Sequence, residues 1–291
     1  MALKVELSAN DIVKVIKAFR DNYNYDFSHY AELSFKRRIE YLLISHNLYG
    51  VDDLVERTAR DEKYFKKCIN DITVNTTELF RDADVWLNLK QNVFPLFKDK
   101  SSINIWHAGC SSGEEVYSTL ILLNEMNLLE KVKVLGTDIN TDILEIAKKG
   151  VFNRRLNNGY FENYNKVLKT NNSNYQEAPD LPVKFSKYFE SDDSGKSIKV
   201  KKFIRDKATF RFHNLVDGSV LSRFDLIFCR NVIIYFNPVL QNKVIKKFHE
   251  SLFHQGMLLV GIHENISYLP VGSKFEARFM KGLYVKKIIR D

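Results

Sequence analysis

The first 70 positions of the chain carry apolar residues at intervals of three and four. This spacing is present in residues 12–19 and again in residues 33–43. Residues spaced in this way share one face of an α-helix. Ser8 or Asn10 could cap the first helix. The pattern therefore predicts a helical region at the start of the chain.

From about residue 100 the pattern changes to apolar runs that are separated by turn residues and helical stretches. Four runs are predicted to be buried strands, at 103–109, 131–138, 224–231 and 256–263. Strands that alternate with helices form a mostly parallel sheet, with ligand sites at the carboxyl ends of the strands. Residues 275–289 predict a closing antiparallel pair of strands.

The alternation of strands and helices is lost between about residues 151 and 208. Residues 171–182 are polar and predict a loop, and a hairpin is predicted around Ser194 and Gly195. We interpret this part as a β-hairpin subdomain inserted in the sheet domain. The predicted organisation is a helical domain, a linker, a sheet domain and an insertion within it: 1–71, 72–85, 86–291 and about 184–206.

Composition narrows the class of protein and its surroundings. The chain has 291 residues, of which 45% are hydrophobic and five are proline, as expected of a folded globular protein. No apolar run reaches the roughly 20 residues of a membrane span, and the charged start does not resemble a secretory signal. Three widely spaced cysteines predict neither disulfides nor a metal site. We expect a cytoplasmic protein without membrane insertion and without bound metal.

A net charge of +8 predicts attraction to an anionic partner. Nucleic acid, an acidic protein surface and an anionic membrane face all satisfy this condition. Charge alone does not choose among them.

A turn of small residues, from Gly109 to Gly113, follows the first predicted strand. Such a turn lets a ligand approach the backbone closely, at the amino end of a helix. Glu114 and Glu115 come directly after it. Two acidic residues disfavour a pyrophosphate and suit a ligand that carries an ammonium or sulfonium group.

Polar residues also end two further predicted strands. Asp138 ends the second strand, about 25 residues beyond Gly113, where a carboxylate can accept both hydrogen bonds of a ribose diol. Arg230 and Asn231 end the strand that begins at Phe224. Each residue taken alone also fits a simple strand exit. Together they predict a nucleoside-binding site at the carboxyl edge of the sheet.

These segments resemble the chemotaxis-receptor methyltransferases of the CheR type, which esterify protein glutamates. The similar segments follow the family's order: ITVNTTELFRD (72–82), WHAGCSSGEEVYS (106–118), GTDINTDILEIAKKGVF (136–152), HNL (213–215), FDLIFCRNVIIYF (224–236) and GMLLVGIHEN (256–265). The resemblance implies a Rossmann-like S-adenosylmethionine methyltransferase sheet, with an antiparallel end strand, behind a small helical domain. It implies S-adenosylmethionine as the cofactor and S-adenosylhomocysteine as the product.

The resemblance also implies roles for individual residues. Arg81 and Tyr235 are the expected catalytic residues, at the methyl-transfer centre. The expected cofactor-binding residues are Asn75, Thr77, Arg81, Gly109, Glu114, Asp138, Asn214, Leu215, Arg230 and Asn231. A glutamate carboxylate has a reference pKa near 4.3 and is already a nucleophile at neutral pH, so no general base is needed.

The expected partner is the cytoplasmic domain of a chemotaxis receptor, with its acidic methylation helices. The resemblance places the basic residues Lys36, Arg37 and Arg38 against these helices, although a solvated charged helix face is the alternative. A receptor tail peptide could add a strand to the β-subdomain. Three features depart from the family: Val116 in place of the usual proline, His263 in place of a small residue, and a longer loop at 163–183.

Two other functions compete with this interpretation. The positive charge would suit a methyltransferase that acts on nucleic acid or another protein. Enzymes that methylate amino groups of nucleic acids often carry an Asn/Asp-Pro-Pro-aromatic motif after the equivalent strand, whereas this chain continues from Asn231 with Val232 and Ile233. A cofactor-binding signalling module without catalysis is the second alternative. Retention of Arg81 and Tyr235 favours an enzyme, and nucleic acid is not the expected partner.

Overall fold

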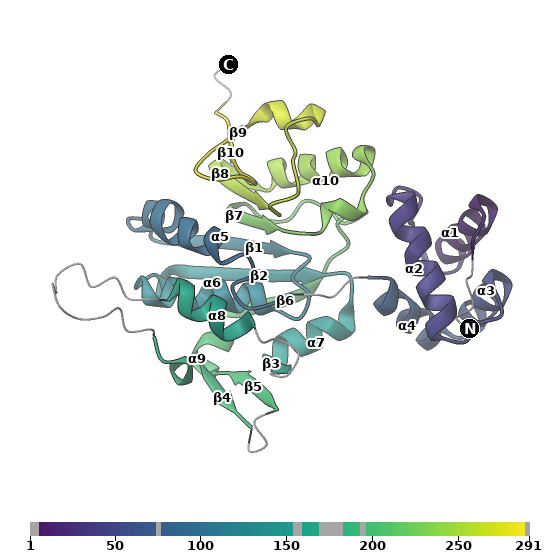
Figure 1. Cartoon of the computed structure of the whole chain (residues 1–291). Coiled ribbons are helices and arrows are strands. Elements are labelled where there is room, and N and C mark those ends of the chain that lie inside the picture. The colour runs from purple at the N-terminus through teal and green to yellow at the C-terminus, as the bar shows by residue number, and fades with distance from the viewer. Residues whose placement is uncertain (1–5, 74–76, 154–158, 169–182, 193–195, 289–291) are drawn as a thin grey trace. The chain divides into compact units, whose positions relative to one another are not determined.

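The fold is that of a computed structural model, which describes residues 6–73, 77–153, 159–168, 183–192 and 196–288. The chain divides into two compact units (Figure 1). The helical unit consists of Met1–Asn75 and Val232–Val244, and the sheet unit consists of Thr76–Asn231 and Ile245–Asp291. The domain boundaries inferred from the sequence stay predictions.

The helical unit is built from amphipathic helices. Their bounds are α1 (Ala9–Tyr23), α2 (Glu32–Ser45), α3 (Val51–Arg60) and α4 (Glu62–Ile72). Ser8, not Asn10, caps α1: its hydroxyl accepts a hydrogen bond from the Asp11 amide at 3.2 Å, and the Asp11 carboxylate accepts one from the Ser8 amide at 2.9 Å. This reciprocal pair is a capping box, which satisfies backbone donors that the first turn leaves unpaired.

The core of the helical unit contains a cluster of aromatic rings, and a distant stretch of chain belongs to the same unit. Phe65 stacks on Tyr23, with ring centroids 3.8 Å apart. The segment Val232–Val244 belongs to the same unit and contains η6 (Ile233–Tyr235). The amide of Ala31 donates to the Tyr235 carbonyl at 2.8 Å, and the rings of Tyr30 and Phe236 meet edge to face. These contacts hold the Tyr235 backbone against the start of α2.

The sheet unit contains a mixed sheet in the order β6-β2-β1-β7-β8-β10-β9. Strands β6, β2, β1, β7 and β8 run parallel, and β10 pairs antiparallel with both β8 and β9. Their bounds are β1 (Ile103–Ala108), β2 (Val132–Asp138), β6 (Ala208–Phe212), β7 (Phe224–Cys229), β8 (Leu252–Val260), β9 (Phe275–Ala277) and β10 (Leu283–Lys286). The expected mostly parallel sheet with an antiparallel end is confirmed.

Helices and a small second sheet complete this unit. The small sheet is antiparallel, in the order β3-β5-β4, and is drawn in teal and green in Figure 1. The other elements are α5 (Ala83–Asn88), η1 (Leu89–Val93), η2 (Phe94–Phe97), α6 (Glu114–Glu125), η3 (Leu129–Lys131), α7 (Thr141–Lys149), β3 (Val151–Asn153), α8 (Gly159–Val167), η5 (Phe185–Lys187), β4 (Phe189–Ser191), β5 (Ser197–Val200), α9 (Lys202–Arg205), α10 (Pro238–Glu250, shared with the helical unit) and η7 (Pro270–Lys274). The expected inserted β-subdomain is confirmed by the small sheet.

Three details differ from the sequence-based expectations. The strand expected at 256–263 is β8, which begins at Leu252 and ends at Val260. The strand ends there because the Gly261 amide donates a hydrogen bond to the Glu264 carboxylate at 2.6 Å. Strand β3 and helix α8 were not expected: β3 has only three residues, and the apolar spacing of Tyr160, Tyr164 and Val167 on α8 was not recognised among polar neighbours. The expected turn at Ser194 and Gly195 and the loop at 171–182 lie outside the described residues.

Within the described residues, no helix is both long enough and apolar enough to cross a bilayer. In the same part of the chain, no three or more His, Cys, Asp or Glu side chains gather closely enough to hold a metal ion. Cys68, Cys110 and Cys229 are buried and free.

Candidate functional site

The small-residue turn between β1 and α6 is fixed to the neighbouring strand. The amides of Gly109 and Cys110 both donate to the Thr137 carbonyl at the end of β2, at 2.8 and 2.9 Å. Gly113 precedes α6 with a φ of 94°, and a Cβ there would lie 3.1 Å from the Ala147 Cβ. Glycine therefore meets both a left-handed backbone and a close contact with α7.

Asp138 joins this turn to the end of β2. Its Oδ2 accepts a hydrogen bond from the Ser111 amide at 2.9 Å, and its Oδ1 accepts one from the Asn140 amide at 3.0 Å. Burial raises the pKa of Asp138, although these backbone donors act in the opposite direction. The two strand ends that the sequence singled out therefore meet in space.

Glu114 lies at the start of α6 with only 5% of its surface exposed. The Ser112 hydroxyl donates to its Oε2 at 2.6 Å, and the Tyr160 hydroxyl from α8 donates to its Oε1 at 2.9 Å. Burial raises the pKa of Glu114, and both hydrogen bonds oppose that shift. Among the described residues, the side-chain donors to this carboxylate are neutral hydroxyl groups rather than a cation. A ligand ammonium group would complete its environment.

Glu115 faces a different set of partners. Its Oε1 lies 2.9 Å from Nδ1 of His107, and its Oε2 accepts a hydrogen bond from Nη1 of Arg230 at 3.0 Å. Burial raises the pKa of Glu115, but the His107 hydrogen bond and the Arg230 charge outweigh it, so that this pKa is lowered. Of the two acidic residues after the turn, Glu115 is neutralised inside the protein. Only Glu114 remains suited to a cationic ligand.

The segment that carries Arg81 has a strained backbone. Phe80 and Asp82, on either side of Arg81, have φ values of 52° and 58°. These values lie in the left-handed region, which residues other than glycine rarely adopt. Such residues cost on the order of 1–3 kcal/mol each and persist where the surroundings fix them. Here the Phe80 amide donates to the Ser118 hydroxyl at 2.9 Å, and Nη2 of Arg230 donates to the Arg81 carbonyl at 3.1 Å.

Asn214 and Leu215 follow β6 in a tightly bonded loop. The Asn214 side chain accepts a hydrogen bond from the Val216 amide at 2.9 Å. The Lys247 ammonium donates to the Leu215 carbonyl at 3.1 Å and to two further carbonyls of the loop. The His213 amide donates to the Asp138 carbonyl at 3.0 Å, so the loop begins beside the end of β2.

Asn231 lies two residues beyond the end of β7 and has a φ of 60°. Its amide donates to the Glu264 carboxylate at 2.9 Å, and the same oxygen accepts from the Gly261 amide. Glu264 thus joins the ends of β7 and β8. His263, beside it, is exposed.

Two buried oxygens test whether the site fits the expected cofactor. Ser111 Oγ in the turn and Asn231 Oδ1 at the end of β7 have no hydrogen-bond partner among the described residues. Buried polar atoms are normally paired, so an orphaned atom calls for an explanation such as a ligand. S-adenosylmethionine carries hydroxyl and amino groups that pair with such oxygens. With the carboxylates of Glu114 and Asp138, the residues fit this cofactor.

The structure brings most of the expected site residues to one edge of the sheet. Gly109 and Glu114 follow β1, Asp138 ends β2, Asn214 follows β6 and Arg230 follows β7. These strands are neighbours in the order β6-β2-β1-β7 and run parallel, so their carboxyl ends share an edge. This arrangement is the one in which open α/β sheets bind ligands.

Other expected residues lie elsewhere or outside the described chain. Thr77 and Arg81 belong to the sheet unit, both half-buried, whereas Tyr235 belongs to the helical unit. Asn75 lies outside the described residues. Lys36, Arg37 and Arg38 lie on α2 in the helical unit; Arg37 is exposed, and Lys36 pairs with Glu40 at 4.0 Å.

Sequence reasoning missed two site residues and one pairing between site residues. Tyr160 lies where the alternation of strands and helices is lost, and its helical spacing with Tyr164 and Val167 is the signal that could have found it. Glu264 stands in the segment 256–265, which drew attention for its apolar strand, its family resemblance and His263, but not for a site residue. The pairing of Glu115 with Arg230 joins residues that are far apart in the chain, one in the first turn of α6 and the other just after β7.

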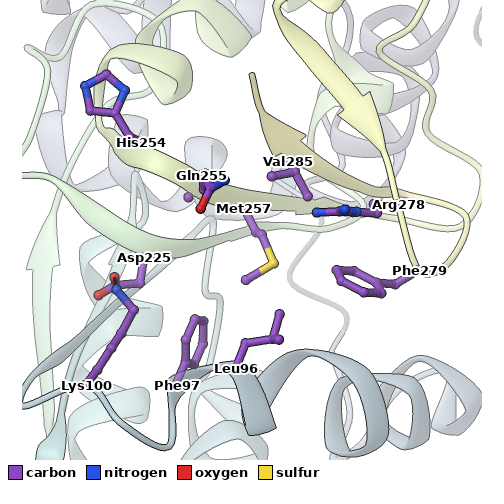
Figure 2. A pocket seen from close by; sticks show the side chains of 11 residues that line it. Leu96, Phe97, Lys100, Asp225, His254, Gln255, Met257, Arg278, Phe279 and Val285 are labelled. Atoms are coloured by element: carbon purple, nitrogen blue, oxygen red, sulfur yellow. Dashed lines mark ion pairs between the residues drawn. The ribbon is translucent and has the colours of Figure 1, made fainter. Parts of the chain in front are cut away.

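A pocket of about 340 Å³ lies at the opposite, amino edge of the sheet. Figure 2 shows Leu96, Met257 and Phe279 turned toward one another in it. Lys100 and Asp225 form an ion pair of 2.8 Å at its side. None of the expected cofactor-binding residues lines this pocket.

Known proteins match the chain over almost its whole length. Residues 10–73 match the family described as the all-alpha domain of CheR methyltransferases, and residues 75–177 and 162–280 match its SAM-binding domain. The Pseudomonas putida protein named Cher3 is 37% identical over 266 residues, 91% of this chain and 92% of that protein. Chemotaxis protein methyltransferase 1 of Vibrio cholerae is 30% identical over 251 residues, 83% of each chain. The chemotaxis protein methyltransferase of Borreliella burgdorferi is 27% identical over 298 residues, 98% of this chain and 96% of that protein.

Proposed function

The chain belongs to the CheR methyltransferase family, and from this premise we propose that it methylates glutamate carboxylates of chemotaxis receptors. The family and the cofactor expected from the sequence, S-adenosylmethionine, are both confirmed by these matches. Methyl transfer from S-adenosylmethionine follows from membership of this family. The glutamate acceptor and the receptor partner are the proposed part.

The convergence of polar residues at the carboxyl ends of four neighbouring strands carries the proposal. S-adenosylmethionine supplies a methyl group activated by a sulfonium. We assign the methionine amino group to Glu114, the ribose hydroxyls to Asp138 and the adenine to the loop at Asn214 and Leu215. Gly109 lets the backbone of the turn approach the cofactor. Asn231 offers its unpaired Oδ1 at the end of β7.

A glutamate acceptor suits the residues on this edge of the sheet. A carboxylate is ionised at neutral pH and needs no general base. Arg81 can align the acceptor through charge-assisted hydrogen bonds. Transfer from a sulfonium to a carboxylate removes both charges, so alignment and exclusion of water supply most of the rate. Arg81 must hold the carboxylate loosely, because a tight ion pair would also stabilise the ground state.

Roles for Tyr235 and Thr77 are proposed from the family resemblance. An aromatic face favours a cation, and we assign Tyr235 to the sulfonium on this ground. The Ala31 amide donates to the Tyr235 carbonyl, which fixes the Tyr235 backbone within the helical unit. We assign Thr77 and Asn75 to cofactor contacts on the family resemblance.

The proposed protein partner is an acidic helical surface. Lys36, Arg37 and Arg38 give one turn of α2 three positive charges, and Arg37 is exposed. Strand β4 lies at the edge of the small sheet, which offers a position for strand addition by a receptor tail peptide. Acidic methylation helices fit the first surface by charge.

Transfer of radioactive methyl groups tests the proposal. The whole chain is given labelled S-adenosylmethionine with cytoplasmic receptor fragments and, separately, with nucleic acid. We expect label on the receptor fragment that is released by mild base, as methyl esters are. Fragments with the acceptor glutamates changed to alanine serve as the matched control and should take up no label. Label on nucleic acid alone, or base-stable label on protein, would refute the glutamate acceptor.

A further inference from the structure

A buried ion network lies directly behind the Arg81 backbone. At its centre is the guanidinium of Arg230, whose side chain is only 1% exposed. Nη1 of Arg230 donates to Glu115 Oε2 at 3.0 Å, and Nη2 donates to Asp82 Oδ2 at 2.6 Å and to the Arg81 carbonyl at 3.1 Å. The described contacts of Arg230 are therefore with protein groups, and two of them are with the linker.

Glu115 connects this guanidinium to the interior of the sheet. Its other oxygen pairs with Nδ1 of His107 on β1, and Nε2 of His107 lies 3.1 Å from the Thr119 hydroxyl. The His107 ring stacks on Phe228 of β7, with ring centroids 4.3 Å apart. His107 itself is fully buried. Glu115 is thus held by the rigid core on one side and holds Arg230 on the other.

The linker needs such an anchor because its backbone is strained at Phe80 and Asp82. Helix α6 provides both fixed points: Ser118 holds the Phe80 amide, and Glu115 holds Arg230. The same helix begins with Glu114, which we assign to the cofactor. One rigid element therefore links the cofactor site to the backbone that presents Arg81.

From this geometry we propose that Glu115 is a positioning residue for methyl transfer. Acting through Arg230, it fixes the turn at Phe80, Arg81 and Asp82 and so aims the Arg81 side chain at the acceptor. The proposal rests on the role assigned to Arg81 in the proposed function. In this proposal Arg230 holds the linker by its hydrogen bonds to Arg81 and Asp82. Arg230 also lies beside the cofactor site.

The test variant is Glu115→Gln, which keeps the shape and one oxygen acceptor but removes the charge. Misplacement of a catalytic group by a distant change can cost on the order of 100-fold. We expect kcat to fall by about 10- to 100-fold, while the dissociation constant for S-adenosylmethionine changes less than about threefold. Glu125→Gln, at the other end of α6, is the matched control. Glu125 pairs with Lys187 and Tyr188, outside the site, and its variant should keep full activity.

A double-variant comparison separates positioning from general damage. If Glu115 acts only through Arg81, Glu115→Gln should cost less than about twofold in kcat when added to Arg81→Ala. Added to Asp138→Ala, it should cost its full 10- to 100-fold. Equal losses in both backgrounds would overturn the proposal, as would a loss of cofactor affinity in proportion to kcat. Should Glu115→Gln fail to fold, Asp82→Asn breaks the same link from the linker side.

Hydrogen exchange gives a readout that needs no acceptor. The amides of residues 77–84 should exchange faster in Glu115→Gln than in the wild type, and those of β1 should not change. Unchanged exchange at 77–84 would overturn the positioning role even if the wild type methylates receptors. If the wild type methylates no receptor fragment, the proposed function is refuted instead, whatever the amide exchange rates of residues 77–84.

Discussion

The Tyr160 hydroxyl donates a hydrogen bond to Oε1 of Glu114 at 2.9 Å, although the two residues are 46 positions apart. Tyr160 lies on α8, in the part of the chain where the regular alternation of strands and helices is lost. Its ring is buried, and its hydroxyl meets the carboxylate that we assign to the cofactor amino group. This contact gives a stretch without a sequence motif a direct place in the site.

Tyr160→Phe should weaken binding of S-adenosylmethionine by about tenfold, or roughly 1.4 kcal/mol. The change removes a donor that stabilises the ionised form of Glu114, and the pKa of Glu114 should rise further. Calorimetric titration at neutral pH measures the effect. Tyr164→Phe on the same helix is the control, because its hydroxyl donates to the Lys184 carbonyl instead. Equal affinities for the Tyr160→Phe variant and the wild type would remove Tyr160 from the site.

Asp138→Ala should reduce cofactor affinity by about 1–3 kcal/mol, the range for leaving buried polar partners unpaired. The Ser111 amide loses its acceptor together with the proposed ribose contact. Asp61→Ala is a matched control, since the Asp61 carboxylate also accepts two backbone hydrogen bonds, at the start of α4. It should lower stability by about 1 kcal/mol and leave cofactor affinity unchanged. Calorimetry showing the same affinity for both variants would count against the ribose contact.

Acidification should weaken cofactor binding. Burial raises the pKa of Glu114, so the carboxylate takes up a proton at a higher pH than usual as the pH falls. A protonated Glu114 cannot pair with an ammonium group, and affinity should decline through this raised pKa. Calorimetry in two buffers of different ionisation enthalpy should detect proton release on binding, and Glu114→Gln should abolish the part due to Glu114.

The same shift has the opposite sign for the stability of the ligand-free protein. Because the folded pKa of Glu114 is raised, the folded state binds the proton more tightly than the unfolded state. Its contribution to the free energy of unfolding should therefore increase as the pH falls from the raised pKa to the ordinary one, about 4.3. Denaturant titrations over this window should show a smaller gain for Glu114→Gln. An identical pH profile would contradict the assignment.

Arg81→Ala should reduce kcat by about 10²- to 10³-fold, the usual cost of losing one donor at a transition state. Cofactor affinity should stay within about threefold. Arg278→Ala is the control, since Arg278 is an exposed arginine that lines the pocket at the amino edge of the sheet. Methyl transfer by Arg81→Ala at the normal rate would show that the acceptor is aligned by another group.

Local patterns in the sequence were enough to predict much of the fold. The small-residue turn before Glu114, the acid at the end of β2 and the polar end of β7 each follow an apolar run, and parallel strands bring such ends to one edge. Strand β3 and helix α8 could not be predicted in this way. Strand β3 has only three residues, too few for a period to be recognised, whereas the helical spacing of Tyr160, Tyr164 and Val167 on α8 was a local signal that the loss of the strand and helix alternation obscured.

The sequence by itself determined which chemical groups stand at the strand ends, because apolar runs and turn residues are local properties. Only the tertiary structure decided which partner each group meets. Glu114 and Glu115 are neighbours in the chain, but successive residues of a helix point about 100° apart. Glu114 therefore faces Tyr160 and the proposed ligand, whereas Glu115 faces Arg230. That division depends on what packs around α6, and a sequence pattern does not contain it.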